Sequence, residues 1–220
     1  GIIEAVGPGG DESRVGQRVW IWNGQWQRSF GTAAEYIALP AEQALPLPDG
    51  TSFETGATLG IPALTACHCV FSGGDVDGQT VLVSGGAGTV GYLAVQMAKA
   101  GGAKVLATAS AEALERVRQA GADAVFDYSD PDLADKIMAA SDGVGVNRIV
   151  EVEFGANAET NATVIKPHGT IVSYGSAKDM TPSVPFYTLM FKMITIETVL
   201  VYILAPQQRE AAASRVNAIL

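Results

Sequence analysis

The sequence predicts an α/β protein whose larger part is a doubly wound parallel sheet, and three observations support this fold class. From Thr80 onward, short apolar runs alternate with helical patterns, as in a parallel sheet covered on both faces. A glycine-rich turn joins the first of these strands to the first of these helices. Before Gly50, short apolar runs are separated by Gly, Pro and Asp, which predicts an antiparallel β unit.

The expected elements follow from these patterns in chain order. The first fifty residues hold the strand-like runs IIEAV, RVWIW and AAEYIAL. Two helical patterns come next, TSFETGATLG and IPALTACHCVF, the first with Thr51 or Ser52 as its N-cap. The parallel sheet is expected from the runs TVLVS, KVLAT, AVFDY, RIVEV, TIVSY and ITIETVLVY, with helices near residues 89–100, 111–120, 131–140 and 157–166. Helical spacing assigns the following residues to the core: Val90, Leu93, Ala94, Met97, Ala98, Leu114 and Val117.

Composition narrows the function classes. The chain has 220 residues, a formal net charge of -9 and a sequence pI near 4.6, which argues against a nucleic-acid partner. The longest apolar stretch, residues 190–204, is interrupted by Lys192 and Glu197, so we expect no membrane span. The chain starts without Met and stops inside the helical pattern QREAAASRVNAIL, so we expect it to be part of a longer protein.

The two cysteines are expected to be buried structural thiols. Cys67 and Cys69 fall in a helical pattern, where residues two apart do not share a face and could not easily bind one metal ion. So few cysteines, too close together for a disulfide framework, favour a reducing compartment, and we expect the protein to be cytoplasmic.

The glycine-rich turn predicts a dinucleotide site. Gly86, Gly88 and Gly91 fit G-x-G-x-x-G directly after a strand and at the start of a helix. One glycine permits the turn, the next lets the backbone approach a pyrophosphate, and the third lets helix and sheet pack closely. The alternative, a merely flexible turn, is less favoured because the regular alternation that follows is that of a Rossmann-type fold.

The end of the second sheet strand favours NADPH over NADH. NAD-binding units place an Asp or Glu there to hold the ribose hydroxyls, but this chain has Thr108, Ala109 and Ser110. Arg116 and Arg118 follow as possible counter-charges for a 2'-phosphate, although each is equally well explained as part of a solvated helix face.

With these features in view, the chain resembles the zinc-independent branch of the medium-chain dehydrogenase/reductase superfamily, the quinone oxidoreductases that include zeta-crystallin. The resemblance rests on these segments in order: IIEAVGPG, VGQRVW, TAAEYIALP, LPDG, GATLGIPALTA, VLVSGGAGTVGYLAVQMAKA, AGADAVFDY and GTIVSYGS. It implies the latter part of a GroES-like β domain over residues 1–60 and a Rossmann NADP-binding domain over 61–204. Residues 205–220 would begin the return to the first domain.

The resemblance also implies that no zinc is bound. Zinc-dependent relatives insert a four-cysteine lobe where this chain has IWNGQWQRSFGTA, and they carry a cysteine ligand where it has Ile61. Without a Lewis acid, reduction of an electron-poor quinone or enone fits better than alcohol dehydrogenation. An enoyl or enone reductase, or an NADPH-binding protein of the crystallin kind without turnover, are the alternative functions.

The family's cofactor contacts carry over to particular positions of this sequence. Asn157 could equally cap a helix, Tyr128 could be an ordinary strand-end aromatic, and Ala113 replaces a lysine that many members use to grip the 2'-phosphate. No catalytic residue is assigned, and His68 and His168 lack the partners of a triad. The last sheet strand pairs with its copy in relatives, which implies a homodimer, although packing of a buried strand alone would explain the same apolar residues. The implied cofactor-binding residues are Thr65, Gly86, Ala87, Gly88, Thr89, Val90, Gly91, Ser110, Arg116, Tyr128, Asn157, Tyr174, Gly175, Ser176, Val199, Leu200 and Val201.

Overall fold

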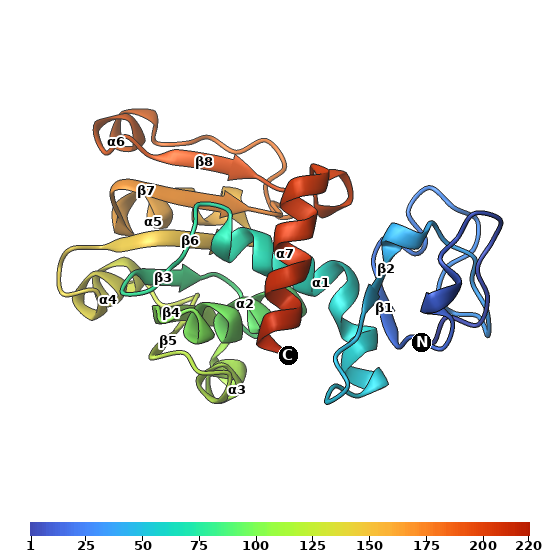
Figure 1. Cartoon of the computed structure of the whole chain (residues 1–220). Coiled ribbons are helices and arrows are strands. Elements are labelled where there is room, and N and C mark those ends of the chain that lie inside the picture. The colour runs from blue at the N-terminus through green and yellow to red at the C-terminus, as the bar shows by residue number, and fades with distance from the viewer. The chain divides into compact units, whose positions relative to one another are not determined.

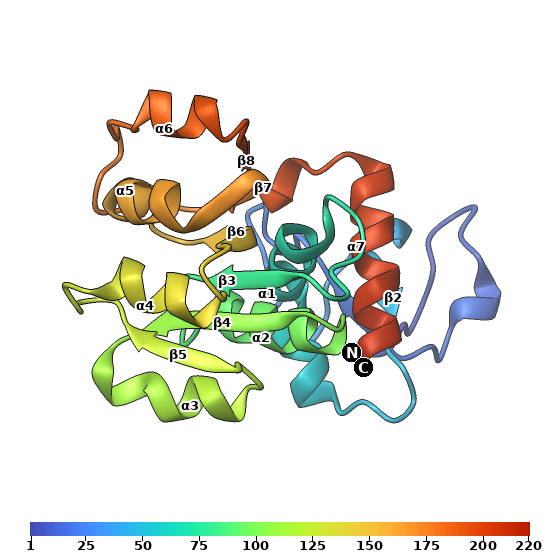
Figure 2. The ribbon, with the colours of Figure 1, turned by 90° about the vertical axis from the view of Figure 1, so that its left-hand side faces the viewer.

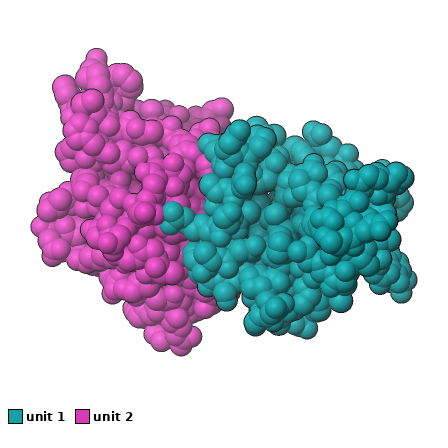
Figure 3. Space-filling model, in the orientation of Figure 1, with its two compact units in different colours: residues 1–64, 201–220 teal, residues 65–200 magenta.

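The computed structural model describes all of residues 1–220, which form two compact units. Unit 1 contains Gly1–Leu64 and Val201–Leu220, and unit 2 contains Thr65–Leu200 (Figure 3).

Unit 2 is built on a six-stranded parallel sheet in the order β5-β4-β3-β6-β7-β8 (Figure 1). From the middle of the sheet, β3, β4 and β5 follow one another in one direction, and β6, β7 and β8 follow one another in the other. This is the doubly wound order of a Rossmann-type sheet. The predicted fold class is therefore confirmed. The strands are β3 (Thr80–Val83), β4 (Lys104–Ala109), β5 (Ala124–Asp127), β6 (Val146–Glu151), β7 (Ile165–Ser173) and β8 (Thr195–Thr198).

Helices cover both faces of this sheet. Helix α2 packs on β3 and β4, and α3 packs on β4 and β5, whereas α5 packs on β6 and β7 and against α4 (Figure 2). Right-handed crossovers that run in opposite directions from the middle of a sheet place their helices on opposite faces. The helices are α2 (Thr89–Ala100), α3 (Leu114–Gln119), α4 (Leu133–Ala140), α5 (Phe154–Val164) and α6 (Phe186–Phe191).

The core of unit 2 lies between the sheet and these helices. Ala94, Met97, Ala98 and Val117 are buried as expected from helical spacing. Val90, Leu93 and Leu114 are only half-buried, because they lie at or near the helix starts that face the carboxyl edge of the sheet. The expected buried positions are thus correct along the helix bodies.

Two element boundaries differ from the expectation. The strand expected over residues 194–202 ends at Thr198, because its partner β7 ends at Ser173, whose carbonyl accepts the last bond from Val199 N at 2.8 Å. Residues 201–203 form a short 3-10 turn instead. Strand β7 starts before the expected TIVSY run, and its pairing with β6 shifts register across the KPHG segment, where His168 has φ of 62°.

Unit 1 contains a small antiparallel pair, β1 (Val19–Ile21) and β2 (Ala44–Pro46), extended by a bridge between Ile2 and Arg18. The strand expected for AAEYIAL is wrong, since residues 33–39 pair with no strand. Helix α7 (Pro206–Ile219) packs on the pair: Trp20 Nε1 donates to Asn217 Oδ1 at 2.9 Å, and Asn217 Nδ2 donates to the Pro46 carbonyl at 3.0 Å.

Helix α1 (Phe53–Phe71) contains both of the expected helical patterns, with a kink at Gly60, two residues before Pro62. Ser52 caps it as expected, because Ser52 Oγ accepts from the Thr55 amide at 3.1 Å. Cys67 and Cys69 are buried and unbridged, as expected. None of the helices has the length and apolar character needed to cross a membrane.

Candidate cofactor site

The glycine-rich turn lies at the carboxyl end of β3, next to β6, where the strand order of the sheet reverses. Ligands of open parallel sheets bind at the carboxyl ends of the strands around this point. Ser110, Tyr128, Tyr174 and Val199 directly follow β4, β5, β7 and β8, so the fold brings them to the same edge. The sequence therefore distributes its candidate residues along one edge of one sheet.

The turn is held by the neighbouring strand β4. Gly85 N donates to Thr108 Oγ1 at 3.2 Å, and Gly86 N donates to the Thr108 carbonyl at 2.8 Å. Gly85 has φ of +68°, in the left-handed region that favours glycine. The residue that makes the sharp turn is thus Gly85, which sequence reasoning missed because it precedes the first glycine of the fingerprint.

The three fingerprint glycines have different surroundings. A Cβ at Gly91 would lie 2.8 Å from the Gly85 carbonyl carbon, and one at Gly86 would lie 2.9 Å from Val117 Cγ1, so both glycines permit close packing. At Gly88, an added Cβ would meet only the Gly85 oxygen at 3.4 Å, and the residue is exposed. The open space beside Gly88 is where a pyrophosphate would approach the backbone.

The first turn of α2 leaves its amides unused. Gly88 is the N-cap and no side chain caps the helix. The N–H groups of Thr89, Val90 and Gly91 donate to no protein acceptor, and neither does that of Ala87. Free amides at the positive end of a helix favour an anion, so the turn fits the diphosphate of a dinucleotide.

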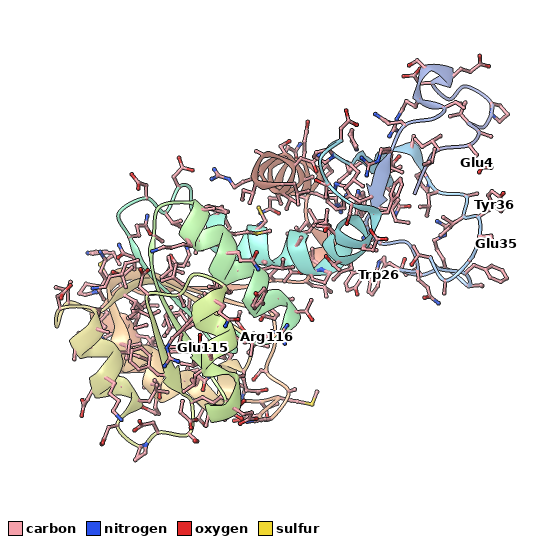
Figure 4. The ribbon with its side chains drawn as sticks, turned by 90° about the horizontal axis from the view of Figure 1, so that it is seen from below. Glu4, Trp26, Glu35, Tyr36, Glu115 and Arg116 are labelled. Carbon is pink, nitrogen blue, oxygen red and sulfur yellow. The ribbon has the colours of Figure 1, made fainter.

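The β4–β5 end of the edge contains both acidic and basic groups. The backbone N–H of Glu112 itself and, to a smaller extent, the nearby hydroxyl of Ser110 lower the pKa of the exposed Glu112 carboxyl. Arg116 on α3 (Figure 4) lies with its guanidinium carbon 5.0 Å from the Tyr92 ring centroid. Tyr128 is 53% exposed, and Lys178 Nζ lies 5.6 Å from its ring centroid. Sequence reasoning missed Glu112 and Lys178.

A buried carboxylate organises the β6 side of the turn. Glu151 ends β6, is fully buried, and accepts four hydrogen bonds through its two oxygens. Ser84 Oγ donates at 2.9 Å, linking Glu151 to the residue before the glycine turn. Asn161 Nδ2 donates at 2.7 Å, and the remaining donors are Asn157 Nδ2 at 2.9 Å and Glu153 N at 2.7 Å. This network ties β3, β6 and α5 together.

The network also determines which way Asn157 faces. Helix α5 begins at Phe154 after an N-cap at Glu153, so the capping alternative for Asn157 is wrong. Because a carboxylate only accepts, the Asn157 amide nitrogen must face Glu151. Asn157 is half-buried, and its Oδ1 is therefore the atom left to accept a hydrogen bond from a ligand.

The segment after β7 is fixed by backbone contacts. Tyr174 N donates to the Glu151 carbonyl at 3.0 Å, and the Gly175 carbonyl accepts from Phe154 N at 3.0 Å. Ser176 Oγ accepts from Gly155 N at 2.9 Å. Burial, together with the nearby Cys69 and Glu151, raises the pKa of Tyr174, so its phenol remains protonated.

The last predicted contacts are divided between the two units. Thr65 is a buried residue of α1. Val199 and Leu200 follow β8 in unit 2, whereas Val201 is a buried residue of unit 1. His68 is buried on α1 with its Nε2 2.8 Å from Glu197 Oε1 on β8, which gives it a structural partner within unit 2.

Neither cysteine nor any acidic or histidine cluster forms a metal centre. No group of three or more His, Cys, Asp or Glu side chains within residues 1–220 is arranged to hold a metal ion. Burial, with a smaller effect of Glu197, raises the pKa of the Cys69 thiol to about 12. Cys69 is therefore an inert core thiol at neutral pH.

The fold and the glycine turn are typical of dinucleotide-binding α/β proteins, and comparison with known proteins specifies the family. Residues 89–217 match the family described as zinc-binding dehydrogenase. Rat (Rattus norvegicus) quinone oxidoreductase is 35% identical over 177 residues, which are 80% of this chain and 53% of the relative. This chain thus spans about half the length of that relative.

Solved structures agree with this assignment. An alcohol dehydrogenase superfamily protein from Novosphingobium aromaticivorans has a TM-score of 0.85 at 29% identity, covering 99% of this chain and 65% of that one. Escherichia coli quinone oxidoreductase complexed with NADPH has a TM-score of 0.81 at 25% identity, covering 100% of this chain and 68% of that one. The chain belongs to the zinc-binding dehydrogenase family of the medium-chain dehydrogenase/reductase superfamily. Its similarity to quinone oxidoreductases agrees with the resemblance that the sequence indicated.

Proposed function

We propose that this protein is a zinc-free, NADPH-dependent oxidoreductase that transfers a hydride to a quinone or a similar electron-poor acceptor. The observation that carries the proposal is the uncapped start of α2, whose free amides face the point where the strand order reverses. The chain belongs to an oxidoreductase superfamily, and the similar E. coli quinone oxidoreductase was solved with NADPH.

The residues of this chain would bind and orient the cofactor. NADPH, when bound, supplies the hydride. The amides of Ala87, Thr89 and Val90 would hold the diphosphate, and Asn157 Oδ1 would accept a hydrogen bond at the nicotinamide end. Glu151 keeps that oxygen exposed to the ligand by holding the amide nitrogen. Orientation of this kind supplies much of the rate enhancement in hydride transfer.

Absence of zinc is part of the proposal. The segment IWNGQWQRSFGTA has no cysteine, and Ile61 occupies the position that carries a cysteine ligand in zinc-dependent relatives. Metal analysis of the full-length protein is expected to find no stoichiometric zinc, and activity is expected to survive dialysis against a chelator. Stoichiometric zinc whose removal abolishes activity would contradict this part.

Homodimer formation through β8 is also part of the proposal. Strand β8 is one of the two edge strands of the sheet, the other being β5. Large apolar side chains on α6 and β8 remain exposed, including Phe191 at 80% and Ile196 at 41%. An open apolar edge favours pairing with a second copy. Light scattering should give a dimer mass, reduced to a monomer by Ile196→Lys but not by Val144→Lys, a control at a residue that is 64% exposed away from β8. A monomeric parent protein would contradict the assignment.

We also place the protein in the cytoplasm, because its two buried cysteines form no disulfide, which favours a reducing compartment.

The decisive experiment is NADPH consumption by the full-length protein. A simple benzoquinone and an α,β-unsaturated thioester serve as separate acceptors, and NADH serves as the alternative donor. Fast oxidation of NADPH with the quinone supports the proposal. Preference for the thioester would make the protein an enoyl reductase, and tight NADPH binding without turnover would make it a binding protein.

A further inference from the structure

Lys178 lies in the loop after β7, and contacts with the start of α5 fix this loop. Lys178 N donates to Glu153 Oε1 at 2.7 Å. Asp179 lies so close to Gly155 that a Cβ added there would be 2.7 Å from Asp179 Cβ. Ser176 Oγ completes the contact by accepting from Gly155 N at 2.9 Å. The backbone at Lys178 is therefore positioned by the β6 side of the edge.

The ammonium group of Lys178 reaches the β5 end of the carboxyl edge of the sheet, on the other half of the sheet from β7. Its Nζ lies 5.6 Å from the ring centroid of Tyr128, which follows β5. Strands β7 and β5 are separated by three others, so the four spacings amount to about 19 Å at roughly 4.8 Å each. The loop and the side chains of Lys178 and Tyr128 together span this distance.

The Tyr128 end is the part of the edge expected to receive the adenosine ribose. Tyr128 N donates to the Ala109 carbonyl at 3.1 Å, so Tyr128 lies beside the end of β4. The ribose of a bound dinucleotide lies at the end of this second strand. The glycine turn, where the pyrophosphate would lie, is two strand spacings from β5, about 10 Å away.

Arg116 supplies one cation at this end, and the exposed carboxylate of Glu112 supplies a negative charge. A 2'-phosphate held at Ser110 would be two residues along the chain from that carboxylate, so a second cation would favour its binding. Position 113 is alanine and offers no charge. Lys178 takes part in none of the five ion pairs in residues 1–220, so its charge is free to meet an anionic ligand. Its contact with Tyr128 keeps that charge at the ribose end.

We propose that Lys178 is a specificity residue that binds the 2'-phosphate of NADPH from the loop after β7, across the edge from the strand that usually supplies this contact. The inference rests on the proposed NADPH-dependent function. Because NADH lacks the 2'-phosphate, Lys178 strengthens the binding of NADPH alone.

The test compares cofactor dissociation constants in the full-length protein. Lys178→Gln is expected to weaken the binding of NADPH about tenfold, which is the effect of losing one charge-assisted hydrogen bond. It should change the dissociation constant of NADH by less than about twofold. Lys178→Arg should keep most of the NADPH affinity. Lys104→Gln makes the same charge change at the amino end of β4, where Lys104 pairs with Asp142 at 3.2 Å, and should affect neither cofactor.

The outcomes separate this inference from the function on which it rests. If Lys178→Gln weakens the binding of NADPH and NADH equally, Lys178 contacts the diphosphate and the inference is wrong. The inference is also wrong if the variant changes neither dissociation constant. Binding of neither cofactor by the unmodified protein would instead overturn the proposed function. Lys178 is exposed, so the variant is expected to fold, and its melting temperature checks this.

Discussion

The buried carboxylate of Glu151 gives a prediction whose magnitude can be worked out from its contacts. Glu151→Gln keeps the shape of the side chain but replaces one acceptor oxygen with an NH2 donor. Each carboxylate oxygen accepts two hydrogen bonds, one of them from an Asn side-chain amide. Whichever oxygen the glutamine NH2 replaces, it would therefore face a side-chain NH2 group, that of Asn157 or that of Asn161, instead of an acceptor.

The expected loss of stability follows from these contacts. A buried donor without an acceptor costs about 1–3 kcal/mol, and hydrogen bonds to a charged group contribute more than neutral ones, so we expect a loss of about 2–4 kcal/mol. For a chain of this size, that corresponds to a decrease in melting temperature of roughly 5–15 °C. Differential scanning calorimetry or denaturant titration measures it directly.

Two further variants make the test specific. Glu115→Gln on α3 removes an exposed charge whose pair with Arg118 is 3.4 Å long, and it should change stability by less than about 0.5 kcal/mol (Figure 4). Adding Asn161→Asp to Glu151→Gln places a carboxylate opposite the new amide and should recover part of the loss. If Glu151→Gln alone is as stable as the parent protein, the network does not hold β3, β6 and α5 together as described.

Two other predictions concern the cofactor edge and the thiols. Glu112→Gln removes the carboxylate close to Ser110, and it should strengthen NADPH binding about threefold without changing the affinity for NADH. Fluorescence titration measures both affinities, and an unchanged NADPH affinity would show that the 2'-phosphate does not approach Glu112. Cys67 and Cys69 should resist thiol reagents at pH 8 in the native protein, because both are buried and the pKa of Cys69 is raised to about 12. Rapid labelling of either thiol without denaturant would contradict this burial.

The sequence predicted the sheet of unit 2 well because its signals are local. Alternation of strands and helices, the fingerprint around Gly88 and the apolar face of α2 can each be recognised within about a dozen residues. The handedness of the crossovers then determines the face of the sheet on which each helix lies. Local signals were also misleading: AAEYIAL has the alternation of a strand but finds no partner, and the last strand stops at Thr198 because β7 stops.

The parts of the site that were missed depend on residues far apart in the chain. Ser84 and Glu151 are brought together across the sheet, and Lys178 meets Tyr128 across three intervening strands. No pattern within one segment indicates such pairs. Gly85 could have been found, because it is directly followed by Gly86, the first glycine of the fingerprint, and either of two adjacent glycines can adopt the left-handed conformation.

The most direct test of the central claim is the affinity of Gly88→Leu for NADPH. Gly88 has extended backbone angles, and a Cβ added there would meet only the Gly85 oxygen at 3.4 Å, so the variant should fold. Leucine is a poorer N-cap than glycine, and we expect the melting temperature to fall by no more than about 5 °C. Its side chain would occupy the approach of the diphosphate, and NADPH binding should weaken at least about a hundredfold, or ~2.7 kcal/mol. A folded Gly88→Leu protein that binds NADPH as tightly as the parent would show that the glycine turn is not the cofactor site.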